Sequence, residues 1–155
     1  MGKVKVDRDR EHLVAVVAPR NKTKDYSEYL KVLTGVIHVI DEIEYKHGRE
    51  KNQFVFMHDG VTSGALSSVI EAINKIKDLL TGRDRIASLR KRPLDIEFYG
   101  KRSQHQWVDD LVEYKPDYYL ILDDGTYQVA QYAVDVANEN DIDYMVVRVK
   151  TKEQK

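Results

Sequence analysis

The chain has 155 residues, with 25 Lys and Arg against 26 Asp and Glu, so its formal net charge at pH 7 is -1. A chain of this length suits one domain of ordinary size, and its balanced charge creates no strong field that would draw it onto nucleic acid or anionic lipid. It contains no cysteine, which excludes disulfide bonds, thiolate zinc sites and a cysteine nucleophile.

The ends of the chain are charged. Residues 1–10 lack the apolar stretch of a secretory signal, and no apolar run approaches the roughly 18 residues of a membrane span. We therefore expect a soluble, cytoplasmic protein that makes no membrane contact. We expect a single domain over residues 1–155, with its core at about 13–149.

The first half of the chain alternates strand and helix patterns. Residues 13–18 form an almost unbroken apolar run, which predicts a strand covered on both faces. Apolar side chains then recur at helical spacing from Tyr26 to about His47, which predicts a long helix. We expect a second strand over residues 54–57 and a second helix from Leu66 to near Gly82.

The second half continues this alternation. We predict strands over residues 94–99, 118–122 and 144–149, with helices over 104–114 and 126–138. The connection 82–93 carries five cations against one acidic residue, so we expect either a short basic helix or an exposed loop there. Residues 150–155 are predicted to be a frayed tail.

Alternating strands and helices indicate parallel strands, because each parallel crossover needs a connection of helix length. The expected fold is α/β, a single Rossmann-like three-layer sandwich with a mainly parallel five-stranded sheet. In such a sheet the carboxyl ends of the strands meet at one edge. Polar residues that follow several strands are therefore expected to share one crevice there.

Three of these strand ends carry residues suited to binding. Arg20 follows the first strand and offers a bidentate cation to a phosphate or carboxylate, or it is only the solvated end of a turn. The loop after the second strand has glycines for close backbone approach, hydroxyl groups, and a helix N-terminus that favours anions. Its expected ligand-binding residues are Gly60, Thr62, Ser63 and Gly64. Equally, Ser63 caps the helix and Gly60 makes the turn.

The fourth strand leads into Asp123, Asp124, Gly125 and Thr126. A carboxylate here can hold a ribose hydroxyl, bind a metal or act as a general base. Alternatively, Asp124 or Thr126 is only a helix N-cap. The histidines show no ligand spacing, so we expect no zinc site, and nothing calls for a cofactor.

The basic stretch in the 82–93 connection is a second kind of candidate. It could grip the phosphates of a nucleic acid, although a charge run of this length more often forms a solvated face. Its cations are Arg83, Arg85, Arg90, Lys91 and Arg92.

Several of these motifs together resemble the SLOG superfamily of Rossmann-like proteins, over roughly residues 13–149. The superfamily includes the lonely-guy phosphoribohydrolases, the DNA-processing protein A family and small bacterial and phage proteins of the YspA-like type. The residues that carry the resemblance are VVAPR at 16–20 with Asp25-Tyr26 downstream, the Gly60 and Gly64-Ala65 loop, Asp124-Gly125, and residues 142–147.

The chain departs from the YspA-like pattern at two places. Leu66 stands where that pattern has Asp, and Tyr127-Gln128-Val129 replaces its Gly-Thr portion. Bulky side chains after the fourth strand narrow the space in which small residues let backbone cradle a phosphate. The lonely-guy signature Pro-Gly-Gly-x-Gly-Thr-x-x-Glu is absent, so phosphoribohydrolase activity is not supported.

Three functions follow, in order of preference. The first is binding of a nucleotide or nucleotide-derived small molecule by Arg20, the 60–65 loop and Asp124. The second is hydrolysis or transfer at a nucleoside or nucleotide N-glycosidic bond, with Asp124, Asp123 or Asp59 as the carboxylate. The third is a nucleic-acid or protein interaction module that uses the basic stretch. The long first helix also offers a surface for a homodimer.

Overall fold

The computed structural model describes residues 11–47, 53–59, 64–80, 86–91, 103–125 and 128–152. The strands are β1 (Glu11–Val17), β2 (Gln53–His58), β3 (Ile86–Lys91), β4 (Tyr118–Asp123) and β5 (Asp143–Arg148). The helices are α1 (Tyr26–His47), α2 (Leu66–Leu80), α4 (Ser103–Leu111) and α5 (Gln128–Glu139), and the 3-10 helix η3 (Val112–Tyr114) follows α4.

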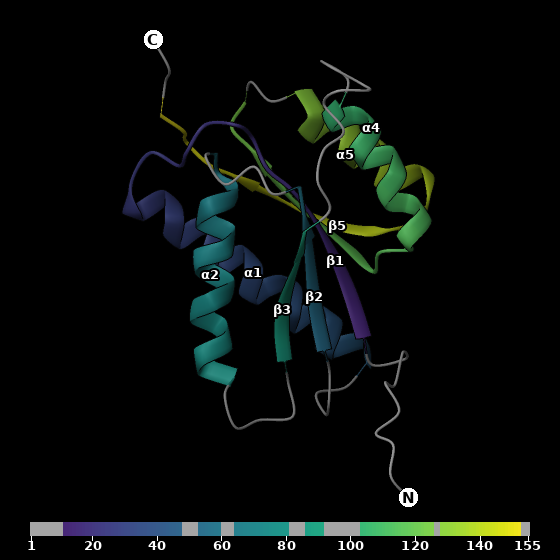
Figure 1. Cartoon of the computed structure of the whole chain (residues 1–155), viewed down its shortest axis with the longest axis horizontal. Coiled ribbons are helices and arrows are strands. Elements are labelled where there is room, and N and C mark those ends of the chain that lie inside the picture. The colour runs from purple at the N-terminus through teal and green to yellow at the C-terminus, as the bar shows by residue number, and fades with distance from the viewer. Residues whose placement is uncertain are drawn as a thin grey trace, which may run out of the picture.

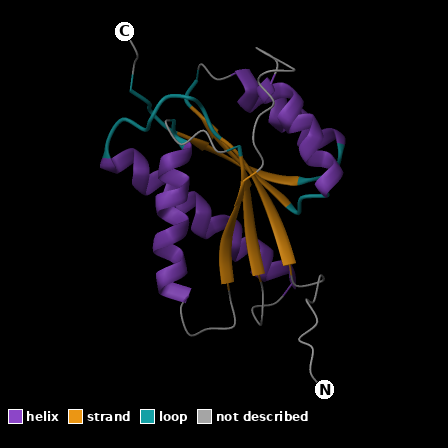
Figure 2. Cartoon of the chain, in the orientation of Figure 1, coloured by secondary structure: helices purple, strands orange, loops and turns teal. Residues whose placement is uncertain are grey.

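The strands form one sheet in the order β3-β2-β1-β4-β5, and every neighbouring pair is parallel. Helices α1 and α2 cover one face, while α4 and α5 cover the other (Figures 1 and 2). The expected α/β class with a parallel sheet is confirmed. The strands are parallel because the helix between two strands returns the chain to the same end of the sheet, so the next strand runs in the same direction.

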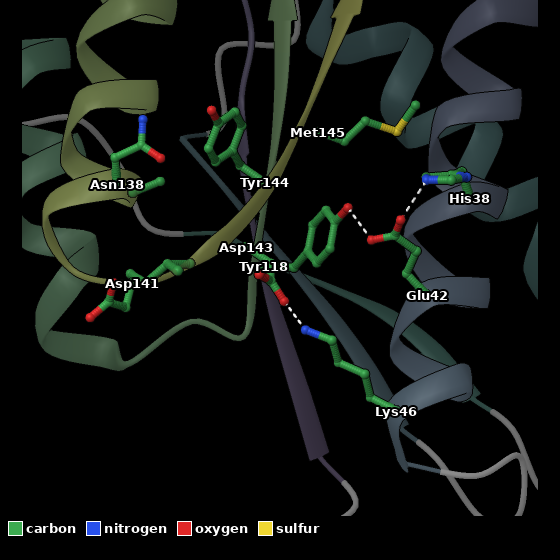
Figure 3. Close-up of a pocket in the computed structure, with 11 residues that line it drawn as sticks. His38, Glu42, Lys46, Tyr118, Asn138, Asp141, Asp143, Tyr144 and Met145 are labelled. Atoms are coloured by element: carbon green, nitrogen blue, oxygen red, sulfur yellow. Dashed lines mark hydrogen bonds and ion pairs between the residues drawn. The ribbon is translucent and has the colours of Figure 1, made fainter.

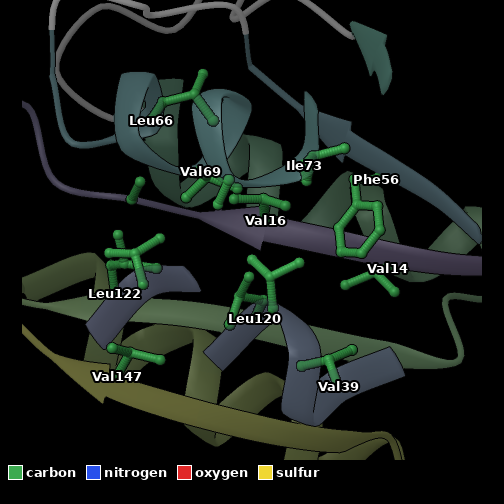
Figure 4. Close-up of a cluster of buried hydrophobic side chains, with 14 of the residues drawn as sticks. Val14, Val16, Val39, Phe56, Leu66, Val69, Ile73, Leu120, Leu122 and Val147 are labelled. Carbon is green, nitrogen blue, oxygen red and sulfur yellow. The ribbon is translucent and has the colours of Figure 1, made fainter. Parts of the chain in front are cut away.

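Two hydrophobic cores flank the sheet, because successive strand residues point to opposite faces. In β4, Leu120 and Leu122 pack beneath α1 and α2, whereas Tyr119 and Ile121 pack beneath α4 and α5. Figure 4 shows part of the first core, where Val14 and Val16 of β1 lie close to side chains of its neighbours. Central strands buried on both faces explain why β1 and β4 read as continuous apolar runs.

The predicted helices agree closely with the structure. Helix α1 has the predicted bounds, and α2 begins at Leu66 as expected. Trp107 of α4 is 3% exposed and packs between this helix and the sheet. Strands β1, β2, β4 and β5 begin and end within two residues of their predicted positions.

Strand β3, which lies beside β2, was not predicted. Residues 94–99 lie outside the described residues, and the strand that pairs with β2 is β3, from Gln53 opposite Ile86 to His58 opposite Lys91. The prediction of a basic helix or loop is therefore wrong for residues 86–91. The cations argued against a strand, but among the described strands β3 pairs only with β2 and lies at the edge of the sheet, where charged residues are common because they discourage association with other chains.

The prediction of a frayed tail is wrong for residues 150–152. Lys24 N donates to Lys150 O at 2.8 Å, and Lys152 N donates to Lys22 O at 2.8 Å. Thr23 and Thr151 form an antiparallel bridge between these bonds. We call residues 150–152 the C-terminal strap. Its backbone hydrogen bonds come from a distant loop, so no local pattern revealed them.

Candidate functional site

The carboxyl edge of the sheet contains a topological switch point. Strands β1 and β4 are neighbours, yet the chain leaves β1 for α1 on one face and leaves β4 for α5 on the other. In open α/β sheets this reversal leaves a crevice outside the carboxyl ends of the two strands, and ligands bind there. Arg20 lies on the β1 side of this point and Asp124 on the β4 side.

The end of β1 packs directly on the start of α2. Ala65 N donates to Pro19 O at 3.1 Å, and Gly64 lies so close that an added Cβ would come within 2.5 Å of Arg20 O and 2.6 Å of Pro19 O. The two loops meet, as the sequence predicted. The reason for glycine is different, however, because Gly64 admits the protein's own backbone and not a ligand.

The backbone amides at the start of α2 are largely occupied. Ser67 N donates to Gly64 O and Ser68 N donates to Ala65 O, in addition to the bond from Ala65 N. The expectation of free amides for an anion is therefore not met at these three positions. Gly60, Thr62 and Ser63 lie outside the described residues.

Arg20 is exposed. Its guanidinium makes no hydrogen bond or ion pair with any residue in the described ranges. It is thus a cation at the switch point with its five donors available.

Asp124 is half-buried, and its carboxylate accepts a hydrogen bond from within the protein. Its Oδ2 accepts a hydrogen bond from Thr151 Oγ1 at 3.0 Å, while the neighbouring Asp123 Oδ1 accepts one from Gly125 N at 2.8 Å. Gly125 has φ +85 and open space around it, so glycine is needed here for the backbone turn. Thr126 lies outside the described residues.

The C-terminal strap joins the two sides of the switch point. Thr151 bonds to Asp124 on the β4 side and pairs with Thr23 on the β1 side. Thr23 Oγ1 in turn lies 2.6 Å from Ser68 Oγ of α2. One polar chain of contacts therefore links the loops that follow β1 and β4 to the first turn of α2.

Other predicted residues are placed less centrally. Asp59 follows β2 and is half-buried. Arg90 and Lys91 lie on the edge strand β3, and the other three cations of the basic stretch, Arg83, Arg85 and Arg92, lie outside the described residues. On α4, the His105 ring packs 4.9 Å from the Tyr132 ring, and the Tyr132 hydroxyl donates to Asp109 at 2.5 Å.

A cavity of about 620 Å³ lies at the opposite end of the sheet, beside the amino ends of β4 and β5 (Figure 3). No sequence pattern predicted this cavity. Its lining comes from α1, β4, β5 and the end of α5, and comprises His38, Glu42, Lys46, Tyr118, Ala137, Asn138, Asp141, Ile142, Asp143, Tyr144 and Met145.

The polar groups on the α1 side of this cavity bind one another. Tyr118 donates from its hydroxyl to Glu42 Oε2 at 2.6 Å, His38 Nε2 lies 2.9 Å from Glu42 Oε1, and Lys46 pairs with Asp143 (Figure 3). Burial, and then the bond to Glu42, raises the pKa of Tyr118. These contacts tie α1 to the sheet. The four-residue spacing of His38, Glu42 and Lys46 was the available signal, since residues so spaced share one helix face.

Comparison of the chain with protein-family models, with curated proteins and with solved structures finds no match. None of the helices in the described ranges combines the length and apolar character needed to cross a bilayer. Within the same ranges, no three His, Asp or Glu side chains gather in a way that could hold a metal ion. Function is therefore argued from the residues themselves.

Proposed function

We propose that this protein is a Rossmann-like binding domain that holds a nucleotide or nucleotide-derived small molecule at the carboxyl ends of β1 and β4. The observation that carries the proposal is the strand order β3-β2-β1-β4-β5, with the connecting helices on opposite faces. This order creates one switch point, and mononucleotides occupy such points in doubly wound sheets.

The charges on the two sides of the switch point suit the two ends of a nucleotide. Arg20 supplies an exposed guanidinium whose planar fork matches a phosphate. Asp124 supplies a carboxylate that can accept a ribose hydroxyl. A cation for the phosphate and an acceptor for the sugar are the minimum that nucleotide recognition requires.

The Thr151 hydroxyl donates to Asp124 Oδ2 at 3.0 Å, and an ionised carboxylate has about four lone-pair positions on its two oxygens. Thr151 also fixes the direction of the carboxylate, which lowers the entropy lost when a ligand binds. Apart from its chain neighbours, no atom of the described residues lies within 4 Å of the position that a Cβ on Gly125 would take, which suits the approach of a ligand to the backbone.

The proposal is tested by ligand-induced thermal stabilisation, followed by calorimetry on any ligand that responds. The panel contains nucleoside monophosphates, nucleoside diphosphates, cyclic dinucleotides and ADP-ribose, with the matching nucleosides as phosphate-free controls. We expect phosphate-bearing members to raise the Tm because a ligand that binds only the folded state stabilises it. A flat response over the whole panel contradicts the proposal.

Two variants locate the site. Removing a charge-assisted hydrogen bond costs about 1.5–3 kcal/mol, so Arg20→Ala should weaken binding by roughly 10- to 100-fold, and Asp124→Asn should weaken binding of ribose-containing members. Lys75→Ala is the matched control, because it removes one exposed cation from α2 away from the carboxyl edge. Equal binding by Arg20→Ala and Lys75→Ala would place the site elsewhere.

A further inference from the structure

Most of the large apolar side chains recorded as exposed lie on helix α1. Four of the five large apolar side chains exposed in the described ranges belong to it: Tyr26 at 66%, Leu30 at 41%, Ile37 at 41% and Tyr45 at 93%. At 100° per residue these four fall within an arc of about 100° on the helix. They form one stripe along the helix, which we call the α1 stripe.

The α1 stripe is not needed for the fold of a single chain. The opposite side of α1 supplies the core residues Val32, Val36, Val39, Ile40 and Ile43, and α2 packs beside it on the same face of the sheet (Figure 1). An amphipathic helix normally presents charged and polar residues on its outer side. Apolar residues that continue along that side indicate a surface that another molecule covers.

Two charged residues on this side of α1, one within the arc of the stripe and one next to it, indicate the chemistry of that molecule. Lys31 lies in the first half of α1 and Asp41 in the second half, and both side chains are exposed. When two copies of α1 run antiparallel and cross near Val36, Lys31 of each copy lies level with Asp41 of the other. The same arrangement brings Tyr26 level with Tyr45, so the stripe is complementary to itself in both charge and apolar character.

Lys31 already binds Glu28 but has a donor for Asp41 of a second copy. Its ammonium group bonds to the two oxygens of Glu28, at 2.8 Å and 3.1 Å, and an ammonium group has three donors. Asp41 forms no hydrogen bond or ion pair within the described ranges. A parallel arrangement would instead set Lys31 against Lys31 and Asp41 against Asp41, which is unfavourable.

We propose that a second copy of this chain packs antiparallel on the α1 stripe, giving a two-fold symmetric dimer. Such an interface is isologous, so each contact occurs twice. It is formed by residues of α1, none of which belongs to the proposed nucleotide site.

The first test is sedimentation equilibrium of the full chain and of single variants. We expect the wild type to dimerise, and we expect Ile37→Lys to raise the dimer dissociation constant at least about tenfold, because it buries an unpaired charge at the centre of the stripe. Tyr114→Lys is the control, since Tyr114 is 47% exposed but belongs to η3. A wild type that stays monomeric, or a dimer that Ile37→Lys leaves intact, overturns the proposal.

The second test exploits the symmetry of the contact. Lys31→Asp alone sets acid against acid in its own dimer, and Asp41→Lys alone sets cation against cation, so each variant should dimerise at least about tenfold more weakly. Mixing the two restores both pairs, and we expect heterodimers in native mass spectrometry. Circular dichroism verifies that each variant is folded. Failure of the mixture to associate while both variants are folded rules out the antiparallel arrangement.

Discussion

Thr151 Oγ1 lies 3.0 Å from Asp124 Oδ2, although the two residues are 27 positions apart and belong to segments that follow different strands. The bond fastens the C-terminal strap to the loop after β4. The backbone of the strap is held at the same time by Lys22 and Lys24 in the loop after β1. Residues that follow β5 therefore link the loop after β1 to the loop after β4.

The strap predicts a stability effect for Thr151→Val. Valine keeps the shape of threonine but removes the donor to Asp124, so we expect a loss of about 1 kcal/mol in the free energy of unfolding by urea. Thr34→Val is the matched control, because its hydroxyl bonds to Leu30 O on an exposed turn of α1. It should change stability by less than about 0.5 kcal/mol. Equal effects of the two variants would show that the Thr151 bond is not stabilising.

The environment of Glu28 predicts that the stability of the fold depends on pH. Its side chain is 4% exposed, and it accepts hydrogen bonds from Lys31 Nζ at 3.1 Å and from Lys150 N at 2.5 Å. The bond from Lys31, followed by that from the Lys150 amide, lowers the pKa of Glu28 below its ordinary value of 4.5, against the opposing effect of burial.

A lowered pKa in the folded state means that the unfolded chain takes up the proton first. The stabilising contribution of Glu28 is therefore complete above its ordinary pKa and is lost as the pH falls through the lowered value. We expect urea midpoints of the wild type to fall as the pH is lowered below the ordinary pKa of 4.5, and those of Glu28→Gln to fall less. Parallel curves for the two proteins would contradict this assignment.

Tyr118 and Tyr119 are adjacent in β4, and we expect their replacement by phenylalanine to have opposite effects on the free energy of unfolding. The hydroxyl of Tyr118 donates to Glu42, so Tyr118→Phe should cost about 1.5–3 kcal/mol, the usual value for a bond to a charged group. The hydroxyl of Tyr119 is fully buried and has no hydrogen-bond partner among the residues that the structure describes. Burial raises the pKa of Tyr119 to about 12.

Tyr119→Phe should therefore leave the free energy of unfolding unchanged or increase it, because it removes a buried polar group that gains nothing from its surroundings. Each variant loses one oxygen from the same strand, so each serves as the control for the other in urea denaturation. A large loss of stability in Tyr119→Phe would reveal a partner for its hydroxyl, such as a buried water.

The tight contact at Gly64 predicts that alanine lowers the free energy of unfolding more at this position than at Gly35. A Cβ there meets the backbone oxygens of Pro19 and Arg20, which cannot move aside without shifting the end of β1. We expect Gly64→Ala to lower the free energy of unfolding by about 1–3 kcal/mol. Gly35→Ala, measured in the same urea series, should cost less. Its Cβ meets a methyl group of Val147 at 2.6 Å, and the gain in helix propensity of about 1 kcal/mol offsets part of the clash.

Much of the fold could be predicted because the signals were local. The apolar spacing of α1 depends only on which side of one helix faces the sheet, and its predicted bounds agree with the structure. Central strands are apolar on both faces, so β1 and β4 could be recognised without knowing their neighbours. The edge strand β3 was missed because its hydrogen bonds come from β2, while its charged residues resemble those of a loop.

For the candidate site, the sequence by itself determined which residue types follow each strand, because strand ends can be read from apolar runs and turn residues. It determined that Arg20, Gly64 and Asp124 all come after predicted strands or before predicted helices. Only the tertiary structure decided how these residues are used. Gly64 packs on the protein's own backbone, the amides of Ala65, Ser67 and Ser68 bond internally, and Asp124 is bonded to Thr151. Such contacts join segments that are distant in the chain. The spacing of residues along a sequence indicates only the contacts within one segment.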